Sequence, residues 1–230
     1  MLELKNIYKT FNPGTINEKR ALNGLNLKLN EGDFVTVIGG NGAGKSTMLN
    51  AVAGTWPVDE GQILIDNIDV TKLSEHKRAT YLGRVFQDPM TGTAATMGIE
   101  ENLALAKRRG KSRLLRSGIT KAEREEYKEL LKILGLGLED RLTSKVGLLS
   151  GGQRQALTLL MATLQKPKLL LLDEHTAALD PKTATKVLEI TDMTVNRDHL
   201  TTLMITHNMK DAIAHGNRLI MMMEGKIILD

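Results

Sequence analysis

The sequence predicts an α/β fold that is built on a mainly parallel sheet and carries a helical subdomain. Continuous apolar runs at Phe34–Ile38 and at residues 168–172 are typical of strands that are buried on both faces, as in a parallel sheet. Segments with helical spacing alternate with such strands, which is the order of an α/β protein. Between about residues 89 and 147, Leu, Glu, Lys and Arg recur at helical spacing, which indicates a mostly helical subdomain.

The remaining elements follow from local signals. Strands are also expected at residues 2–5, 25–29, 62–65, 84–86 and 201–205, with a C-terminal hairpin of residues 218–222 and 226–229. Helices are expected over Lys45–Ala53, from Thr120 onward (a capping box), from Ser150 to about residue 164, from Asp180 onward, and over Met209–Ala214. Residues 12–20 are polar and contain a Pro-Gly turn, so we expect a loop there.

Composition limits the classes of function. The 230 residues contain no cysteine, which excludes disulfides, thiolate zinc sites and cysteine nucleophiles. The net charge is +4, and the densest basic stretch runs from Lys107 to Arg116. Three interpretations of this stretch stay open, namely a solvated or partner-facing loop, a contact with anionic lipid, and a contact with nucleic acid. No run of about 20 apolar residues and no signal-peptide pattern occurs, so any work at a membrane requires a separate partner chain.

A phosphate-binding loop is predicted at residues 39–46. Gly39-Gly40-Asn41-Gly42-Ala43-Gly44-Lys45-Ser46 has the spacing G-x-x-x-x-G-K-S and lies between a buried strand and a helix. Glycines let successive backbone N–H groups approach a phosphate, and the helix N-terminus adds positive potential. We expect Lys45 to reach the β- and γ-phosphates of a nucleotide and Ser46 to hold Mg²⁺. A plain glycine-rich connection is the alternative.

Polar groups at the ends of three other strands predict the rest of an active site. Asp173 and Glu174 follow the apolar residues 169–172, and we expect Asp173 to hold Mg²⁺ and Glu174 to orient or deprotonate the attacking water. His207 follows the strand at 201–205 and is a candidate contact to the γ-phosphate, whereas Gln87 follows the strand at 84–86 and could sense metal or water. Surface acids, a structural histidine and a plain surface glutamine are the alternatives.

A second anion-binding helix start is predicted at Leu149-Ser150-Gly151-Gly152-Gln153. Ser150 and Gln153 form a capping box, and the two glycines allow close approach. With the elements above, this sequence resembles the signature of ABC ATPases, and the resemblance covers residues 2–230. It implies that two copies face each other head to tail, with each ATP lying between the phosphate loop of one copy and the signature of the other.

The resemblance also assigns further roles. It implies a P-loop NTPase core with an N-terminal antiparallel β part, made of residues 1–88 and 165–230, and a helical signature subdomain of about residues 89–164. Phe11 is similar to the aromatic residue that stacks on adenine, and Thr47 completes the phosphate loop. Gln87 resembles the Q-loop glutamine, here also a metal ligand, and residues 177–180, which end at Asp180, resemble the D-loop that touches the opposite site.

Three positions depart from the family pattern. His175 stands where proline is most common, Met161 where many members carry arginine, and Gly40 where proline or serine is usual. None of the three removes a group that the chemistry needs.

The resemblance therefore predicts an ATPase subunit, using ATP and Mg²⁺, that powers a transporter. The sequence around these motifs resembles that of a bacterial subgroup of importers, which work with an amino-acid-type permease and an extracytoplasmic binding protein. We expect this subunit at the cytoplasmic face of the membrane, with residues 91–96 near the docking site of a permease helix, and no nucleic-acid partner. The alternatives are non-import membrane work, such as lipid or protein handling or signalling, and a soluble ABC ATPase acting on DNA or ribosomes.

Overall fold

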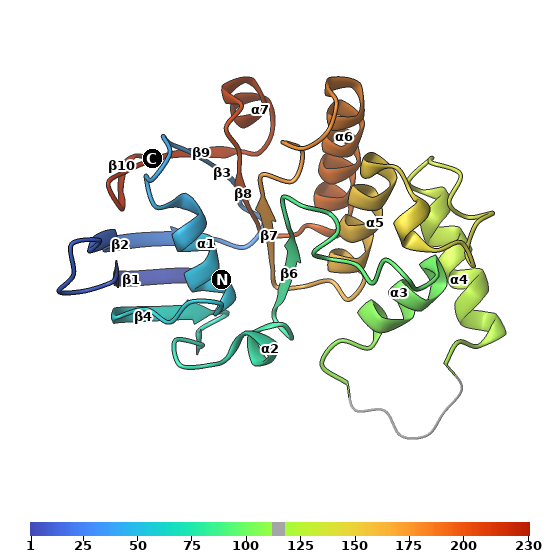
Figure 1. The fold of residues 1–230 in the computed structure, drawn as a ribbon, viewed down its shortest axis with the longest axis horizontal. Helices are drawn as coiled ribbons and strands as arrows, with labels where there is room; N and C mark the ends of the chain where they lie inside the picture. The colour runs from blue at the N-terminus through green and yellow to red at the C-terminus, as the bar shows by residue number, and fades with distance from the viewer. Residues whose placement is uncertain (112–117) are drawn as a thin grey trace.

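The computed structural model describes residues 1–111 and 118–230, which form two sheets and the helices around them (Figure 1). The strands are β1 (Leu2–Phe11), β2 (Lys19–Leu29), β3 (Phe34–Ile38), β4 (Glu60–Ile65), β5 (Ile68–Asp69), β6 (Leu82–Val85), β7 (Leu169–Asp173), β8 (Thr202–Ile205), β9 (Arg218–Met223) and β10 (Lys226–Leu229). The helices are α1 (Lys45–Ala53), α2 (Glu75–Arg78), α3 (Ile99–Lys107), α4 (Lys121–Lys132), α5 (Gly151–Thr163), α6 (Pro181–Asp198) and α7 (Met209–Ala214), with a 3₁₀ turn at Val146–Leu148. The α/β class is confirmed.

The larger sheet places the candidate site. Its order is β10-β9-β3-β8-β7-β6, and every neighbouring pair is parallel except the terminal hairpin β9–β10. The carboxyl ends of parallel strands meet at one edge of a sheet. The segments that follow β3, β6, β7 and β8 carry the phosphate loop, Gln87, Glu174 and His207 in turn. The four predicted polar segments therefore start from the same edge.

The smaller sheet is antiparallel, in the order β2-β1-β4-β5. Strands β1 and β2 run longer than predicted, so Lys19 and Arg20 lie in a strand instead of in the expected loop. The pairing of β1 with β2 shifts register between Leu4 and Ile7, where Asn6 has a positive φ of 48°. Such a bulge interrupts the period-two alternation that marks a strand in a sequence, and this is why the prediction ended at residue 5.

Helix α1 packs between the two sheets. One buried cluster joins Met48 and Leu49 of α1 to Leu4 of the antiparallel sheet and to Val37 and Leu171 of the parallel sheet. The helix that follows the phosphate loop is therefore fixed on both sides by apolar contacts. This packing makes its N-terminus, where a phosphate would bind, a rigid part of the core.

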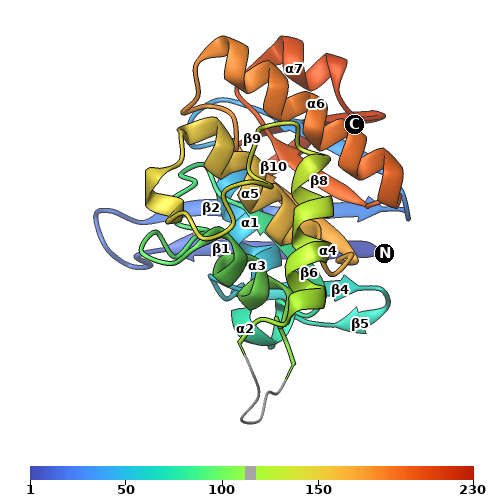
Figure 2. The ribbon, with the colours of Figure 1, turned by 90° about the vertical axis from the view of Figure 1, so that its right-hand side faces the viewer.

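Helices α3, α4 and α5 lie together at one end of the molecule, in front of the sheet in Figure 2. The stretch between α4 and α5 is less helical than predicted. Leu134, Leu138, Leu142 and Val146 recur every four residues, which predicts a helix, yet the chain forms turns there. All four side chains are buried in the cluster that α3, α4 and α5 share with the parallel sheet. The spacing of these four apolar residues thus correctly indicates that they are buried, but it wrongly indicates a helix.

Two short elements, β5 and α2, escaped prediction because each has four residues or fewer. Among the helices formed by residues 1–111 and 118–230, none combines the length and apolarity that crossing a lipid bilayer requires.

Candidate active site

The phosphate loop is a backbone cradle in which two glycines are required both by a positive φ and by the space around them. Gly39 has φ +151° and a Cβ there would lie 2.4 Å from the carbonyl oxygen of Met222, whereas Gly44 has φ +102° and a Cβ there would lie 2.6 Å from that of Ala21. A side chain at either position would displace backbone. The cavity in the cradle measures ≈ 190 Å³. It is lined by Lys19, Ala21, Asn41, Gly42, Ala43, Gly44, Lys45, Ser46, Thr47, Glu174 and His207.

Lys45 is held inside the cradle. Its side chain is 5% exposed and its Nζ donates hydrogen bonds to the carbonyl oxygens of Gly39, at 2.7 Å, and Gly40, at 3.2 Å. Burial lowers the pKa of Lys45, and the carboxylates of Glu174 and Asp173 oppose this shift. A buried ammonium at the start of a helix, next to the exposed Ser46, fits a nucleotide phosphate with its Mg²⁺.

Gly40 is the one cradle glycine that has neither constraint. Its φ lies outside the left-handed range and a Cβ there would meet no atom within 4 Å. We therefore expect Gly40→Ser to bind ATP like the wild type and to raise the free energy of unfolding by roughly 0.4–1 kcal/mol, because it restricts only the unfolded chain. Urea unfolding measures the stability and nucleotide titration measures ATP binding. Gly39→Ala is the matched variant, and we expect it to lower the free energy of unfolding and to weaken ATP binding. Loss of ATP binding in Gly40→Ser would contradict it.

Glu174 and His207 meet beside the cradle. Glu174 follows β7 with a positive φ of 48°, and its amide N–H donates to the carbonyl of Ile205, at the end of β8. The Nε2 atom of His207 lies 2.6 Å from Oε1 of Glu174. A backbone held in a sparsely populated region at a strand end is a known device for fixing a functional side chain. The ends of two neighbouring strands thus bring the predicted base and the predicted histidine into direct contact.

Asp173 lies half-buried at the end of β7. Burial raises the pKa of its carboxyl group, while the charges of Arg84 and Lys45 lower it. A carboxyl group beside the cations of Arg84 and Lys45 supplies oxygen atoms of the kind that Mg²⁺ prefers.

Arg84 is a site residue that the sequence reasoning missed. Its Nη2 atom lies 3.4 Å from Oδ2 of Asp173 and donates to Oδ1 of Asn50 at 2.7 Å, and its guanidinium lies 4.5 Å from the ring centre of Phe86. A charged residue inside the apolar strand β6 was the available signal. Lys19 was also missed, because residue 19 was assigned to a loop; it lines the cradle cavity.

The signature helix start lies apart from the cradle. Ser150 caps α5, since its Oγ accepts from the Gln153 N–H at 3.3 Å and its own N–H donates to Oε1 of Gln153 at 3.1 Å. Leu149 is buried beneath it and Gly151 is exposed. Ser150, Gly152 and Gln153 line a separate cavity of ≈ 320 Å³ that shares no residue with the cradle cavity. The structure therefore does not bring these two anion-binding ends of one chain together.

The remaining predicted residues lie outside the cradle cavity. Phe11 packs edge-on against Trp56, with ring centres 5.0 Å apart, and Gln87 is exposed. Asp180 caps α6 by accepting from the Thr183 N–H at 3.1 Å. Thr183 also contacts the signature, because a Cβ at Gly152 would lie 2.0 Å from its Cγ2. The helix that Asp180 starts is thus fitted directly against the signature helix.

His175, the residue after Glu174, is buried and contacts α6. The imidazole is 2% exposed and its Nε2 lies 3.1 Å from Oγ1 of Thr191, whose hydroxyl can donate to the carbonyl of Val187 at 2.9 Å. The donor roles then follow, with His175 as a neutral N–H donor to Thr191. Burial, with a further contribution from the charge of His215, lowers the pKa of His175 to about 4.

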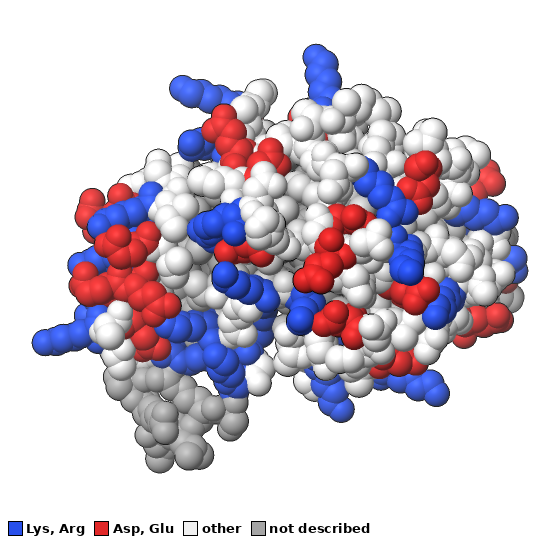
Figure 3. Space-filling view, turned by 180° about the vertical axis from the view of Figure 1, so that it is seen from behind, with Lys and Arg blue, Asp and Glu red and all other residues white. Residues whose placement is uncertain are grey.

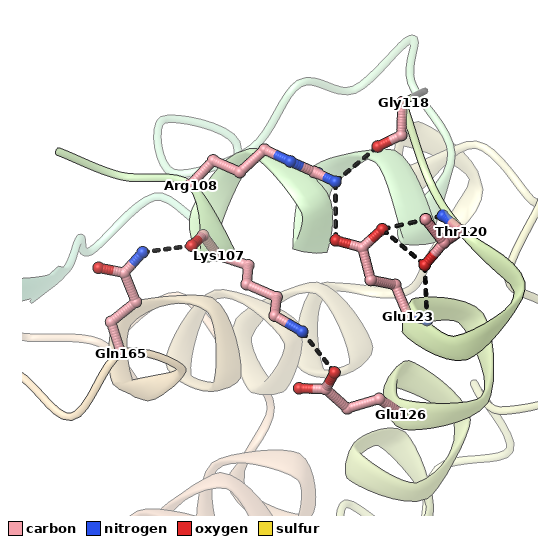
Figure 4. A network of polar contacts seen from close by, with 7 residues as sticks. All are labelled: Lys107, Arg108, Gly118, Thr120, Glu123, Glu126 and Gln165. Atoms are coloured by element: carbon pink, nitrogen blue, oxygen red, sulfur yellow. Dashed lines mark hydrogen bonds and ion pairs between the residues drawn. The ribbon is translucent and has the colours of Figure 1, made fainter. Parts of the chain in front are cut away.

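Lys107 and Arg108, at the start of the basic stretch, make contacts within the chain (Figure 4). Lys107 pairs with Glu126, and Arg108 binds Glu123 at 2.8 Å and the carbonyl of Gly118 at 2.6 Å. Arg113 and Arg116, which also belong to this stretch, lie outside the described residues. On the rear face, Lys and Arg side chains intermingle with Asp and Glu (Figure 3). The described part of the stretch therefore joins α3 to α4.

Comparison with known proteins agrees with this geometry. The family model described as ABC transporter matches residues 22–177. A tyrosine transport ATP-binding protein of Clostridioides difficile is 46% identical over 231 residues, which cover 100% of this chain and 91% of that protein. A spermidine/putrescine import ATP-binding protein of Haemophilus influenzae is 34% identical, and the chain spans 57% of its length.

A solved structure has the same fold. The dimeric, post-hydrolysis state of the ATP-binding cassette MJ0796, bound to ADP and phosphate, superposes with a TM-score of 0.83 at 33% identity, over 99% of this chain and 97% of that one. The chain thus belongs to the ABC transporter family, as an ATPase that binds and hydrolyses ATP with Mg²⁺.

Proposed function

We propose that this chain is the ATPase subunit of an importer for a small organic solute, and that the solute is an amino acid of the tyrosine class. The observation that carries the catalytic part is the meeting of Glu174, His207 and Lys45 around one cradle cavity. The relative with 46% identity over the whole chain, a tyrosine transport ATP-binding protein, supports the substrate class. Import names among the other relatives support the direction.

In the proposed reaction, this chain's residues position and neutralise charge. Lys45 leaves its two carbonyl partners and binds the β- and γ-phosphates. Glu174 takes a proton from the attacking water, and His207, 2.6 Å away, holds that carboxylate and contacts the γ-phosphate. Ser46, Asp173 and Gln87 would hold Mg²⁺, which when bound neutralises phosphate charge. Phosphoryl transfer requires little more than such positioning and charge stabilisation.

A second copy of the chain completes each site in this proposal. The cradle and the signature residues Ser150, Gly152 and Gln153 of one chain line different cavities, which supports a signature, Leu149–Gln153, that serves a nucleotide held by another copy. Phe11 would then stack on the adenine, the other cradle residues would surround the phosphates, and Asp180 would reach the opposite site. The dimeric cassette with ADP and phosphate is consistent with this arrangement.

We further propose the division into a core of residues 1–88 and 165–230 and a helical subdomain of 89–164. The partners proposed are membrane-spanning permease subunits and an extracytoplasmic substrate-binding protein, with this chain bound at the cytoplasmic face of the membrane through the permease. The absence of a spanning helix in the described residues is compatible with such peripheral binding.

The test is to purify the tagged chain from native membranes, identify copurifying proteins by mass spectrometry, and measure uptake of labelled tyrosine by the same cells. We expect a permease in roughly equal amount, and uptake that is lost with Glu174→Gln. Ribosomal or DNA-repair partners without any membrane protein would overturn the transport proposal and leave the ATPase intact. A copurifying permease, together with tyrosine uptake that Glu174→Gln leaves unchanged, would reject only the tyrosine class of substrate.

A further inference from the structure

Lys19 brings a second ammonium group to the cradle cavity. It is the first residue of β2, its side chain is exposed, and it lines the cavity together with the phosphate loop. Its Nζ atom lies close to the loop, since a Cβ built at Gly42 would be 3.3 Å from it. The acid that lines the cavity, Glu174, pairs with His207. The ammonium groups of Lys19 and Lys45 therefore line one small cavity.

Within the part of the chain that the structure describes, the Lys19 ammonium has no carboxylate partner. Glu18, its neighbour in the sequence, accepts instead from the Gly14 N–H at 2.7 Å. Lys9, on the adjacent strand β1, shows the contrast, because its Nζ donates to Oδ1 of Asp59 at 2.9 Å. A cation without an acid, placed at the edge of a cavity beside another cation, attracts an anionic ligand.

The strand pairing places Lys19 beside Phe11. The two residues lie directly opposite each other in the antiparallel pair of β1 and β2. Opposite residues share one face of a sheet, with Cβ atoms about 4.5–5.5 Å apart. The next pair, Thr10 and Arg20, belongs to the other face, because side chains alternate along a strand. Lys19 is thus next to the ring on which the adenine is proposed to stack, whereas Arg20 does not line the cavity.

The backbone that carries Lys19 is packed against the phosphate loop. Strand β2 contacts α1, the helix that the loop starts (Figure 1). A Cβ at Gly44 would lie 2.6 Å from the carbonyl oxygen of Ala21 and 3.3 Å from Cδ2 of Leu22, and both of these residues are buried. The strand is therefore held in place just beyond Lys19. Only the flexible stem of the lysine is left to adjust to a ligand in the cradle.

A nucleotide that is held at both ends passes Lys19 at its middle. In the proposed function, the adenine stacks on Phe11 and Lys45 binds the β- and γ-phosphates. The ribose and the α-phosphate join these two ends, and Lys19 lies between them, opposite Phe11 and with its Nζ near Gly42. We propose that Lys19 binds the α-phosphate of ATP, as a second phosphate-binding lysine of the cradle. This inference rests on the proposed function for the position of the base.

The test compares Mg·ATP and Mg·ADP binding by calorimetry in the wild type and in Lys19→Met, which keeps an apolar stem and removes the charge. The matched control is Arg20→Met, which removes one positive charge from the neighbouring residue on the other face of β2. Lys19→Arg tests whether a retained charge rescues binding. Phe11→Leu tests the base site separately.

We expect Lys19→Met to raise the Kd for ATP and the Kd for ADP by the same factor of roughly ten, because both nucleotides carry the α-phosphate and the lost hydrogen bond is charge-assisted. The loss should shrink in about 0.5 M KCl, since salt screens an exposed ion pair. In hydrolysis, the loss should appear in KM rather than in kcat, as for a contact made equally to ground state and transition state. Lys19→Arg should bind ATP within about threefold of the wild type, and Arg20→Met should bind it as the wild type does.

An unchanged Kd in Lys19→Met, or an equal loss in Arg20→Met, would overturn the inference. A loss for ATP without one for ADP would place the contact at the γ-phosphate and overturn it as well. If Phe11→Leu binds ATP as the wild type does, the base site of the proposed function is overturned instead. A selective loss in Lys19→Met would even then establish that this lysine contacts the phosphates.

Discussion

The Glu174→Gln variant is expected to bind ATP as the wild type does and to hydrolyse it roughly 10²–10⁴-fold more slowly. Glutamine preserves the shape of a side chain whose backbone is fixed by the Ile205 carbonyl and whose Oε1 contacts His207 at 2.6 Å. It removes the group that accepts a proton from water. Phosphate release measures the rate, and a fluorescent nucleotide measures binding.

The matched control for this variant is Glu224→Gln. Glu224 has the same φ of 48° as Glu174 but lies exposed in the turn between β9 and β10. The control distinguishes the effect of removing any carboxylate at this backbone conformation from the effect of removing the Glu174 carboxylate beside the cradle. Residual hydrolysis above about a tenth of the wild-type rate in Glu174→Gln would contradict the role of general base and leave Glu174 as a structural acid.

A pH-dependent loss of stability is expected from His175, whose pKa is lowered to about 4 by burial and by the charge of His215. In the unfolded chain this imidazole binds a proton below about pH 6.5, whereas in the folded chain it stays neutral down to about pH 4. The unfolded state therefore gains protons first. The free energy of unfolding is therefore not reduced by His175 above about pH 6.5, and it falls by about 3 kcal/mol as the pH approaches 4.

Urea unfolding at pH 7.5, 5.5 and 4.5 checks this, with His175→Gln as the comparison. Glutamine keeps an N–H donor for Thr191 and does not titrate. We expect the free energy of unfolding of the wild type to fall more steeply with acid than that of the variant, by up to about 3 kcal/mol at the lowest pH. Parallel curves for the two proteins would show that His175 is not the titrating group.

Short-range patterns were predicted well because their chemistry is local. The strand β3, the helix α1 that follows it and the capping boxes at Thr120 and Ser150 depend on neighbours within a few residues, and the structure has them where the sequence predicts them. Glu174 and His207 are 33 positions apart, yet both follow parallel strands, so the topology rule alone placed them at one edge.

Features that depend on distant partners could not be predicted. The ion pair of Arg84 with Asp173 joins residues 89 positions apart, and nothing in the sequence pairs them. The buried side chains of Gln155 and Asn102 form hydrogen bonds with backbone atoms of Phe86 and Ala94, and no residue pattern in the sequence predicts such bonds. The helical spacing of residues 134–146 failed for a related reason, since burial of leucines every four residues is compatible with turns that pack against α5.

The most direct test of the two-copy site is the mass of the Glu174→Gln chain in solution, measured by light scattering with Mg·ATP, with and without Ser150→Arg. We expect a dimer that Ser150→Arg abolishes while each chain still binds ATP, because Ser150 lies in a different cavity from the cradle. A chain that remains monomeric with ATP bound, or a Ser150→Arg chain that loses ATP binding as a monomer, would contradict a site shared between two copies.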